Sequence, residues 1–209
     1  MNIDKNKLEA MEQRFRAAFI NSLGGFKSLV LIGTQSACGQ TNLAVFSSLF
    51  HLGANPPLFG IIVRPDQADR HTFENIKSTG YFTVNHVSEL FFEKAHQTSA
   101  RYAREVSEFE AVGLTPEYWE NFSVPMVKES AIKWVAQCKE IHDLSINGTH
   151  LVIGEMIEIS YPEECQSPDG WLDIEKAGTL TVSGLDSYHL TKSLGRYSYA
   201  KPNLPLKKL

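Results

Sequence analysis

Hydrophobic residues recur along the chain with two different spacings. Near the N-terminus, apolar residues are spaced roughly as on one face of a helix: Leu8, Met11, Phe15, Ala18 and Phe19. This pattern predicts a helix that ends at Gly24-Gly25. From residue 28 onward the apolar runs are short and are bounded by Gly, Pro and polar residues, which is typical of β-strands. The chain is therefore expected to begin with a helix and to continue mainly as sheet.

The expected strands are short and numerous. They cover residues 28–34, 42–50, 58–64, 81–87, 132–139, 150–161 and 179–182. One helix is predicted to start near residues 69–72 and to end at Gly80, and residues 89–104 are predicted to be helical in parts. Residues 105–128 are expected to be irregular, with Pro116 and Pro125 as breakers. Asn147-Gly148 predicts a tight hairpin turn between two strands.

Many short strands with few helices favour a mainly β fold, a closed or partly closed β-barrel with peripheral helices. The weaker alternative is a doubly wound parallel sheet, but residues 33–39 (GTQSACG) lack the GxGxxG turn expected after its first strand. No repeat, low-complexity tract or long linker divides the chain. We therefore predict one domain over residues 1–209, with an N-terminal helix (1–25), a barrel core (27–160) and a C-terminal extension (161–209).

Charge and composition narrow the function classes. The net charge of −4 argues against a broad nucleic-acid surface. The three cysteines are scattered, with no CxxC pair, which favours a reducing cytoplasm over a disulfide scaffold. No apolar run approaches the ~18 residues that a membrane helix requires, and the N-terminus is unlike a signal peptide. The seven histidines show no metal-binding spacing, so no metal site is predicted.

The segment 38–48 (CGQTNLAVFSS) is the first candidate site. Its small and polar side chains would let a ligand approach the backbone, and Ser47 and Ser48 could each offer a hydroxyl to a phosphate. Because neighbouring strand residues face opposite sides, only one of the two serines can do so in a regular strand. The alternative interpretation is a hairpin turn followed by a half-buried strand.

The segment 64–72 (RPDQADRHT) is the second candidate. It precedes a predicted helix, and a helix start with free N–H groups suits an anion. Arg64, Arg70 and His71 would add positive charge there. In the alternative interpretation, Thr72 is only an N-cap on a solvated turn.

Two histidines are further candidates. His150 directly follows the predicted Asn147-Gly148 turn and could reach a cleft, although a strand histidine is more often structural. His96 and Ser99 could form a nucleophile pair, but the segment has no GxSxG turn and no assignable acid, which disfavours a hydrolase.

Together these segments resemble the flavin reductase-like, FMN-binding split-barrel family, and most closely its flavoredoxin-like branch. The matching stretches stand in the family's order: 38–60 (CGQTNLAVFSSLFHLGANPPLFG), 70–87 (RHTFENIKSTGYFTVNHV), 99–115 (SARYAREVSEFEAVGLT) and 147–159 (NGTHLVIGEMIEI). The tail 195–202 (GRYSYAKP) is similar to the aromatic end of that branch. Thr149 departs from the family, whose G-D-H motif has an aspartate there.

The resemblance implies a six-stranded antiparallel Greek-key split barrel that forms a homodimer and binds FMN near the dimer interface. By the same resemblance, FMN lies along Thr41, Asn42, Leu43 and Ala44, with Ser47 or Ser48 at the ribityl-phosphate. Arg64, Arg70, His71 and Thr72 inherit further phosphate contacts. His150 inherits a contact to the nicotinamide of NADH or NADPH.

The resemblance implies an FMN-dependent oxidoreductase, a flavin reductase or flavoredoxin-like enzyme, whose electron donor and acceptor are small molecules or proteins. No catalytic acid or base is assigned, because flavin chemistry belongs to the cofactor. Two alternatives stay open. One is a non-catalytic FMN-binding electron carrier or flavin store, which Thr149 favours slightly. The other is a split-barrel interaction domain without a cofactor.

Overall fold

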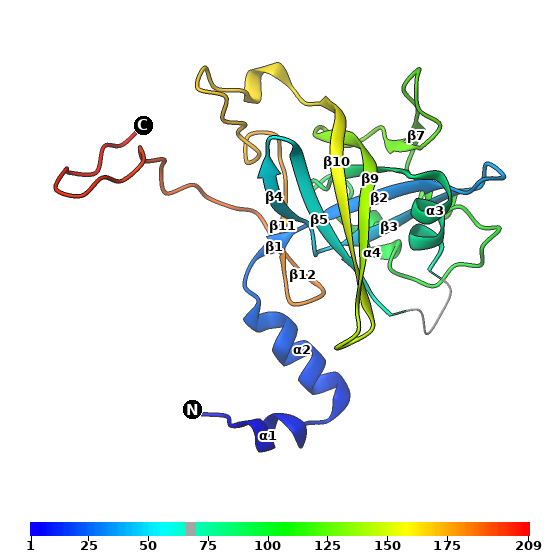
Figure 1. The fold of residues 1–209 in the computed structure, drawn as a ribbon, viewed down its shortest axis with the longest axis horizontal. Helices are drawn as coiled ribbons and strands as arrows, with labels where there is room; N and C mark the ends of the chain where they lie inside the picture. The colour runs from blue at the N-terminus through cyan, green and yellow to red at the C-terminus, as the bar shows by residue number, and fades with distance from the viewer. Residues whose placement is uncertain (66–69) are drawn as a thin grey trace.

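The structure, a computed structural model, describes residues 1–65 and 70–209 (Figure 1). Residues 66–69 of the second candidate segment lie outside the described residues, as does the earliest expected start of the helix at residue 69. The elements are α1 (Lys5–Glu9), α2 (Gln13–Leu23), β1 (Lys27–Ser28), β2 (Val30–Gln35), β3 (Thr41–Phe46), β4 (Phe50–Ala54), β5 (Pro57–Val63), α3 (His71–Thr79), β6 (Tyr81–His86), α4 (Phe92–Gln97), α5 (Glu108–Val112), β7 (Pro116–Glu117), β8 (Met126–Val127), β9 (Lys133–Leu144), β10 (Thr149–Ser160), the 3-10 helix η1 (Glu163–Cys165), β11 (Thr181–Ser183) and β12 (Ser187–His189).

One large sheet carries the fold. Its seven strands run in the order β3-β2-β6-β9-β10-β5-β4, and every pairing among the described strands is antiparallel. The mainly β prediction is therefore confirmed, and the doubly wound alternative is wrong. The sheet has one strand more than the six expected, because the run 42–50 forms β3 and only the start of β4. Ser48 causes this break: its hydroxyl donates to Ile62 O and accepts from Ile62 N, both at 3.0 Å.

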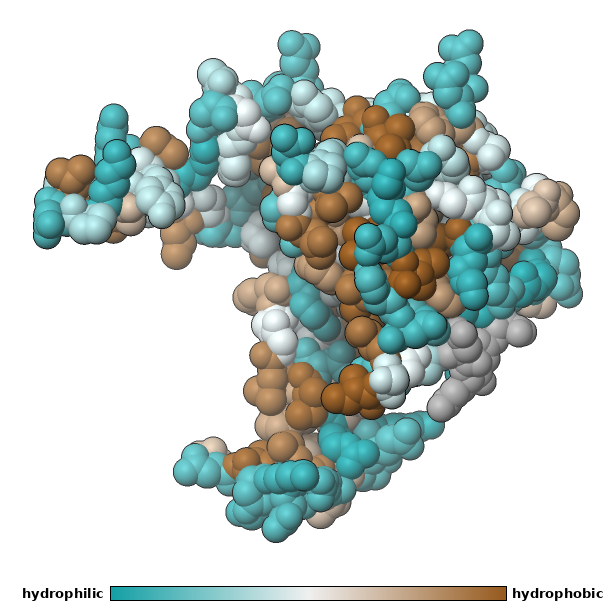
Figure 2. All heavy atoms as spheres, in the orientation of Figure 1, coloured by the Kyte–Doolittle hydropathy of each residue, from teal (hydrophilic) through white to brown (hydrophobic). Residues whose placement is uncertain are grey.

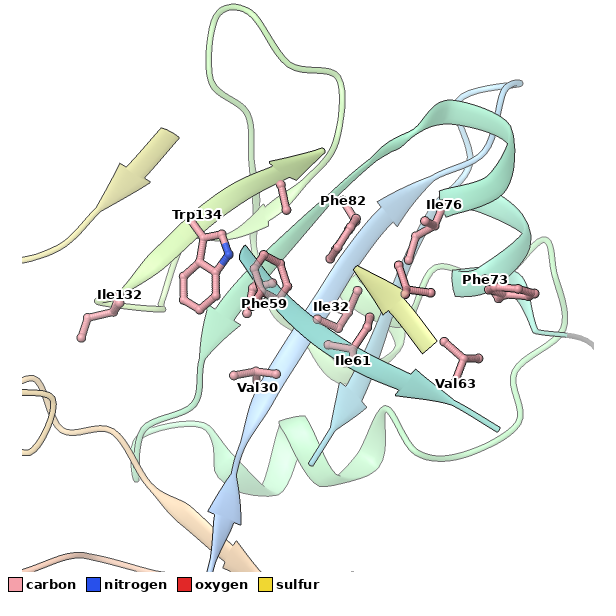
Figure 3. Close-up of a cluster of buried hydrophobic side chains, with 13 residues drawn as sticks. Val30, Ile32, Phe59, Ile61, Val63, Phe73, Ile76, Phe82, Ile132 and Trp134 are labelled. Atoms are coloured by element: carbon pink, nitrogen blue, oxygen red, sulfur yellow. The ribbon is translucent and has the colours of Figure 1, made fainter. Parts of the chain in front are cut away.

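The main core fills the concave side of this sheet (Figure 3). Phe73 of α3 and Val63 of β5 lie at one end of the cluster, and Ile132 and Trp134 lie at the other. Phe59 packs edge-on against both Phe82 and Trp134, at centroid distances of 5.8 and 5.7 Å. Such aromatic packing stabilises beyond the buried area alone.

Both faces of β9 are buried near its start. The alternating pattern of 132–139 places Lys133 and Val135 on the face opposite Trp134, yet the Lys133 side chain is only 8% exposed. The β7–β8 hairpin covers this second face, and Lys133 pairs there with Glu117 and donates to Val127 O. A segment expected to be irregular thus supplies a second layer.

The helix before β6 forms as expected. It starts at His71 within the described residues and ends at Thr79, where Gly80 adopts φ 76° as its C-cap. Phe73 and Ile76 are spaced three residues apart and turn one face of α3 into the core.

The chain ends differ from the prediction. The single expected N-terminal helix is two, α1 and α2, and α2 buries none of its residues. Figure 1 shows α1 and α2 below the barrel and the C-terminal residues extending sideways from it. In the part of the chain that the structure describes, no helix has the length and apolar character needed to cross a bilayer.

Candidate functional site

The two phosphate-suited segments meet in the structure. Asn42 of β3 donates through Nδ2 to Thr72 Oγ1 of α3 at 2.9 Å, and both residues are buried. One turn further along α3, Asn75 donates to Thr34 Oγ1 of β2 at 3.1 Å. These bonds fix the first turn of α3 against the β2–β3 hairpin. Thr72 is therefore engaged across the fold and is not the N-cap, a position that Arg70 occupies.

The first turn of α3 is suited to an anion. Among the described residues, Glu74 Oε1 accepts from Arg70 N at 3.4 Å, but the side chain of the N-cap residue Arg70 makes no capping bond, so the N–H groups that follow Arg70 keep their capacity to donate. Arg70 is held close by, because its Nε donates to Pro65 O at 3.3 Å. His71 Nε2 is buried and has no hydrogen-bond partner within residues 1–65 and 70–209. A buried ring nitrogen without a partner is costly, and a phosphate oxygen would satisfy it.

A carboxylate that the sequence did not reveal lies behind β3. Glu108, at the start of α5, is buried and accepts from Leu43 N at 2.9 Å. Burial raises the pKa of Glu108, while the bond from Leu43 and the nearby His71 oppose that rise. Next to it, Ser107 Oγ and Thr41 Oγ1 are 2.7 Å apart. The N-cap residue and the first residue of α5 therefore hold the outer edge of β3.

Leu43 is a correction to the predicted set. It is completely buried in a second core cluster, and its N–H is taken by Glu108. It has no surface for a cofactor and instead anchors the strand. Ala44, one residue on, is half-buried and lies opposite Ile32 of β2, on the same face of β3 as Asn42.

The predicted serines lie at the far end of β3. Since β3 rises about 3.3 Å per residue, Ser47 lies roughly 16 Å along the chain from Asn42. The Ser48 hydroxyl is already bonded to both backbone groups of Ile62, which leaves Ser47 as the more available hydroxyl. The structure therefore does not bring the serines onto the same spot as Thr72. Arg64, two residues after Ile62, is exposed and extends from the end of β5.

His150 is held in a fixed orientation beside α3. Its ring stacks on Phe73 at a centroid distance of 4.3 Å, and its Nδ1 lies 2.6 Å from Asp143 Oδ1. In the strand register His150 pairs with Asp143 on β9 and with Val63 on β5. Because Thr72 precedes Phe73 and Arg64 follows Val63, His150 belongs to the same cluster as the α3 start.

The hydrolase alternative required His96 and Ser99 to form a nucleophile pair, and the described contacts do not show one. His96 Nδ1 lies 2.5 Å from the hydroxyl of Tyr188, which packs against it, and the described contacts include no bond between His96 and the Ser99 side chain.

A cavity of about 270 Å³ lies elsewhere, between β1, β2 and the Thr179–Thr181 stretch. Of the described residues, none that was predicted for the site lines it. His86 is on its wall, with Nδ1 2.9 Å from Thr179 Oγ1, and burial lowers the pKa of His86 to about 4. This cavity is thus separate from the cluster around α3.

Ser107, Glu108 and Asp143 contact residues of the candidate site and were not found from the sequence. Glu108 is 65 positions from its partner Leu43, and no motif links the two. Asp143 could have been found, since the hairpin turn at 147–148 places it opposite His150. Within the described residues, no group of three His, Cys, Asp or Glu side chains is arranged to hold a metal ion.

Comparison with known proteins gives the family. Residues 23–179 match the sequence model of the flavin reductase-like domain. A proposed flavin reductase with a split-barrel domain from Shewanella frigidimarina NCIMB 400 is 51% identical and superposes with a TM-score of 0.92, over 96% of this chain and all of that one. The flavoredoxin of Desulfovibrio vulgaris (Miyazaki F) shares the fold at a TM-score of 0.69 and 22% identity, over 86% of this chain and 92% of that one.

Among curated relatives, an uncharacterised protein of Aquifex aeolicus is 35% identical over 130 residues, which span 61% of this chain and 65% of the relative's length. The family match covers most of the chain and includes β3, α3 and His150, which form the cluster described above. The chain belongs to the family of flavin reductase-like domain proteins.

Proposed function

We propose that this protein is an FMN-dependent oxidoreductase that takes electrons from NADH, NADPH or a protein donor. One observation carries the proposal: the start of α3 is fixed to β3 by the Asn42–Thr72 bond, and it holds Arg70 and a buried His71 Nε2 that has no hydrogen-bond partner among the described residues. The Glu74 carboxylate in the same turn is paired with Arg104, so the Arg70 charge stays available for an anion in a chain whose net charge is −4.

The residues at this place fit a flavin phosphate. Arg70 and His71 would supply charge-assisted donors, and the first N–H groups of α3 would complete the contact. Thr72 and Asn42 would fix the geometry through their mutual bond. Arg64 extends from the neighbouring strand end and would add a further charge.

The ring would then lie along β3, away from the phosphate. Ala44 is small enough for close approach to the backbone, and Ser47 offers a hydroxyl further along. When bound, FMN supplies the hydride and one-electron chemistry, and the protein supplies binding and orientation. Ser107 and Glu108 would hold β3 in position for the ring, because they bond Thr41 and Leu43 of that strand.

His150 is the proposed contact for a nicotinamide donor. The family aspartate is absent at Thr149, but Asp143 across the hairpin bonds the His150 ring in its place. A carboxylate on Nδ1 fixes the tautomer and the orientation of the imidazole. His150 therefore has a carboxylate partner, Asp143, even though Thr149 stands where the family has an aspartate.

Replacing Asp143 with asparagine tests this role. We expect the variant to keep its FMN affinity and to lose about 10-fold or more in the rate of flavin reduction by NADH, because general positioning effects of this kind are of that order. Stopped-flow absorbance under anaerobic conditions measures it. The matched control is Glu140→Gln, which removes the equivalent carboxylate of the His142–Glu140 pair on the same hairpin. Equal rates for both variants would refute the role of Asp143.

The absorption spectrum tests the function itself. Purified protein supplied with FMN is expected to be yellow and to bleach when NADH or NADPH is added without oxygen. Protein that stays colourless with FMN would contradict FMN binding and would favour the interaction domain without a cofactor. A yellow protein that no pyridine nucleotide bleaches would favour the second candidate, an electron carrier or flavin store, for which the missing aspartate at Thr149 is the supporting observation.

We also propose a cytoplasmic location. The exposed Cys38 thiol lies 3.1 Å from Ser36 Oγ, and this bond lowers the pKa of the thiol. An exposed thiol with a lowered pKa is easily oxidised, so a reducing compartment would preserve it.

A further inference from the structure

The cavity of about 270 Å³ beside His86 lies where both ends of the chain leave the barrel. Two of its lining residues show this position: Phe26 follows α2, and Thr191 follows β12. Figure 2 shows brown, apolar atoms on this side of the barrel, between the N-terminal helices and the C-terminal residues. Protein interiors hold few voids larger than a water molecule. A cavity of this size therefore indicates a place for a small molecule.

The cavity has an apolar inner wall and a mouth at the surface. Leu29, Val30 and Leu180 line it and are at most 5% exposed, whereas Phe26 and Ile174 line it at 70% and 47% exposure. An apolar cavity of about 150 Å³ binds benzene. This larger cavity thus has room for one substituted ring or an aliphatic body of that size, which gains free energy by leaving water.

The lining carries one positive charge and no negative one. Of the described residues that line the cavity, Lys27 is the charged residue, and none is Asp or Glu. In the part of the chain that the structure describes, Lys27 Nζ donates only to Gly184 O, at 2.6 Å. An ammonium group has three N–H donors, so two remain for a ligand. A half-buried cation without a counter-ion favours an anion at this place.

His86 offers a second polar contact, which carries no charge. Burial lowers the pKa of His86 to about 4, so the ring is neutral near neutral pH. Its Nδ1 lies 2.9 Å from Thr179 Oγ1, and among the described contacts its Nε2 has no partner. The hydroxyls of Ser28 and Thr181 already donate to backbone carbonyls. The cavity therefore suits a ligand with one polar end and an apolar body.

We propose that this cavity binds a small monocarboxylate, with the carboxylate at Lys27 and the apolar body against Leu29, Val30 and Leu180. A carboxylate carries a single charge and two acceptor oxygens, which matches one ammonium group and one imidazole nitrogen. A phosphate monoester carries up to two charges and would meet a single cation here. The inference goes beyond the flavin proposal and is independent of it, because no described lining residue belongs to the α3 cluster.

Calorimetric titration with benzoate, and with benzamide as its neutral analogue, tests the proposal. The wild type should bind benzoate about 10-fold or more tightly than benzamide, since only benzoate makes a charged hydrogen bond. Lys27→Met keeps most of the aliphatic stem and removes the ammonium group. It should weaken benzoate binding about 10-fold or more and leave benzamide binding within about twofold. FMN binding by this variant should stay as in the wild type, which separates this inference from the proposed function.

The matched control is Lys192→Met. Lys192 is exposed and follows Thr191, but it does not line the cavity. The control should bind benzoate within about twofold of the wild type, because an exposed charge is screened. A second variant, Thr191→Trp, fills the mouth at an exposed position and leaves the core untouched. It should abolish benzoate binding without lowering the melting temperature.

Nuclear magnetic resonance on the wild type provides a measurement that needs no variant. Benzoate should shift the imidazole resonances of His86 and leave those of the exposed His142 in place. No saturable binding of benzoate up to about 10 mM would overturn the proposal, since a ligand that fits a cavity of this kind reaches about 1 mM or below. Equal losses of benzoate and benzamide in Lys27→Met would also overturn it, as would a Thr191→Trp protein that binds benzoate like the wild type.

Discussion

Arg70→Ala is expected to weaken FMN binding about 10- to 150-fold, whereas riboflavin binding should change little. The range follows from about 1.5–3 kcal/mol for a hydrogen bond to a charged group. Arg70 lies at the N-cap of α3, and its Nε bond to Pro65 O holds it beside the helix start. Riboflavin lacks the phosphate, so it should not sense the missing guanidinium. Fluorescence titration of the two flavins measures both constants.

The control for this prediction lies on the same helix. Lys77 is in the last turn of α3, and its ammonium sits 5.3 Å from the Phe73 ring. Lys77→Ala removes the same charge six residues after His71, about 9 Å along the helix axis. It should leave the FMN affinity within about twofold, because an exposed charge about one Debye length from the phosphate is largely screened. Equal losses for FMN and riboflavin in Arg70→Ala would mean a general loss of structure, and no loss for either would place Arg70 outside the site.

Gly33→Ala is expected to destabilise the fold by about 3 kcal/mol or more. A Cβ at Gly33 would come closer than 3.0 Å to Pro125 O and Thr83 Oγ1. Pro125 contributes backbone, which cannot rotate away, and Thr83 Oγ1 donates to that same carbonyl at 2.7 Å. Overpacking costs about 1–3 kcal/mol, and a lost buried hydrogen bond adds about 1–3 kcal/mol. For a chain of this size the melting temperature should fall by about 10 °C.

A second glycine provides the comparison. Gly53 is on β4, and the nearest atom to a Cβ there is Pro56 O at 3.5 Å, an ordinary contact. Gly53→Ala should therefore change the free energy of unfolding by less than about 0.5 kcal/mol. Thermal and urea unfolding measure both variants. A Gly33→Ala protein as stable as the wild type would show that the strands β2 and β6 do not approach the Pro125 backbone as closely as described.

Local patterns in the sequence were sufficient for most strands of the large sheet and for α3, but not for α5, β7 and β8, which lie in a segment expected to be irregular. Turn residues and alternating apolar positions located β5, β6, β9 and β10, because strand periodicity and Asn-Gly turns act over a few residues. The end of α3 at Gly80 followed from the same local rules. The pattern failed at 42–50, where the Ser48 bonds to Ile62 divide one apolar run into β3 and β4.

The candidate site was predicted as two separate segments. Arg70, His71 and Thr72 were recognised from charge and helix-start chemistry, and Asn42 from its small and polar neighbours. The Asn42–Thr72 bond that joins the two segments spans 30 positions. Local sequence patterns describe only neighbouring residues, so they could not predict it. Two residues predicted to contact FMN are engaged elsewhere. Leu43 is completely buried, and the Ser48 hydroxyl bonds the backbone of Ile62 in β5.

By itself the sequence determined the mainly β character, the strand positions and the residue types that can hold a phosphate, since these depend on neighbouring residues. Only the tertiary structure decided which of those residues share one place, that Glu108 and Asp143 support them, and that the chain ends stay uncovered. The physical reason is that hydrogen bonding and burial join residues tens of positions apart, and their partners are chosen only when the whole sheet closes.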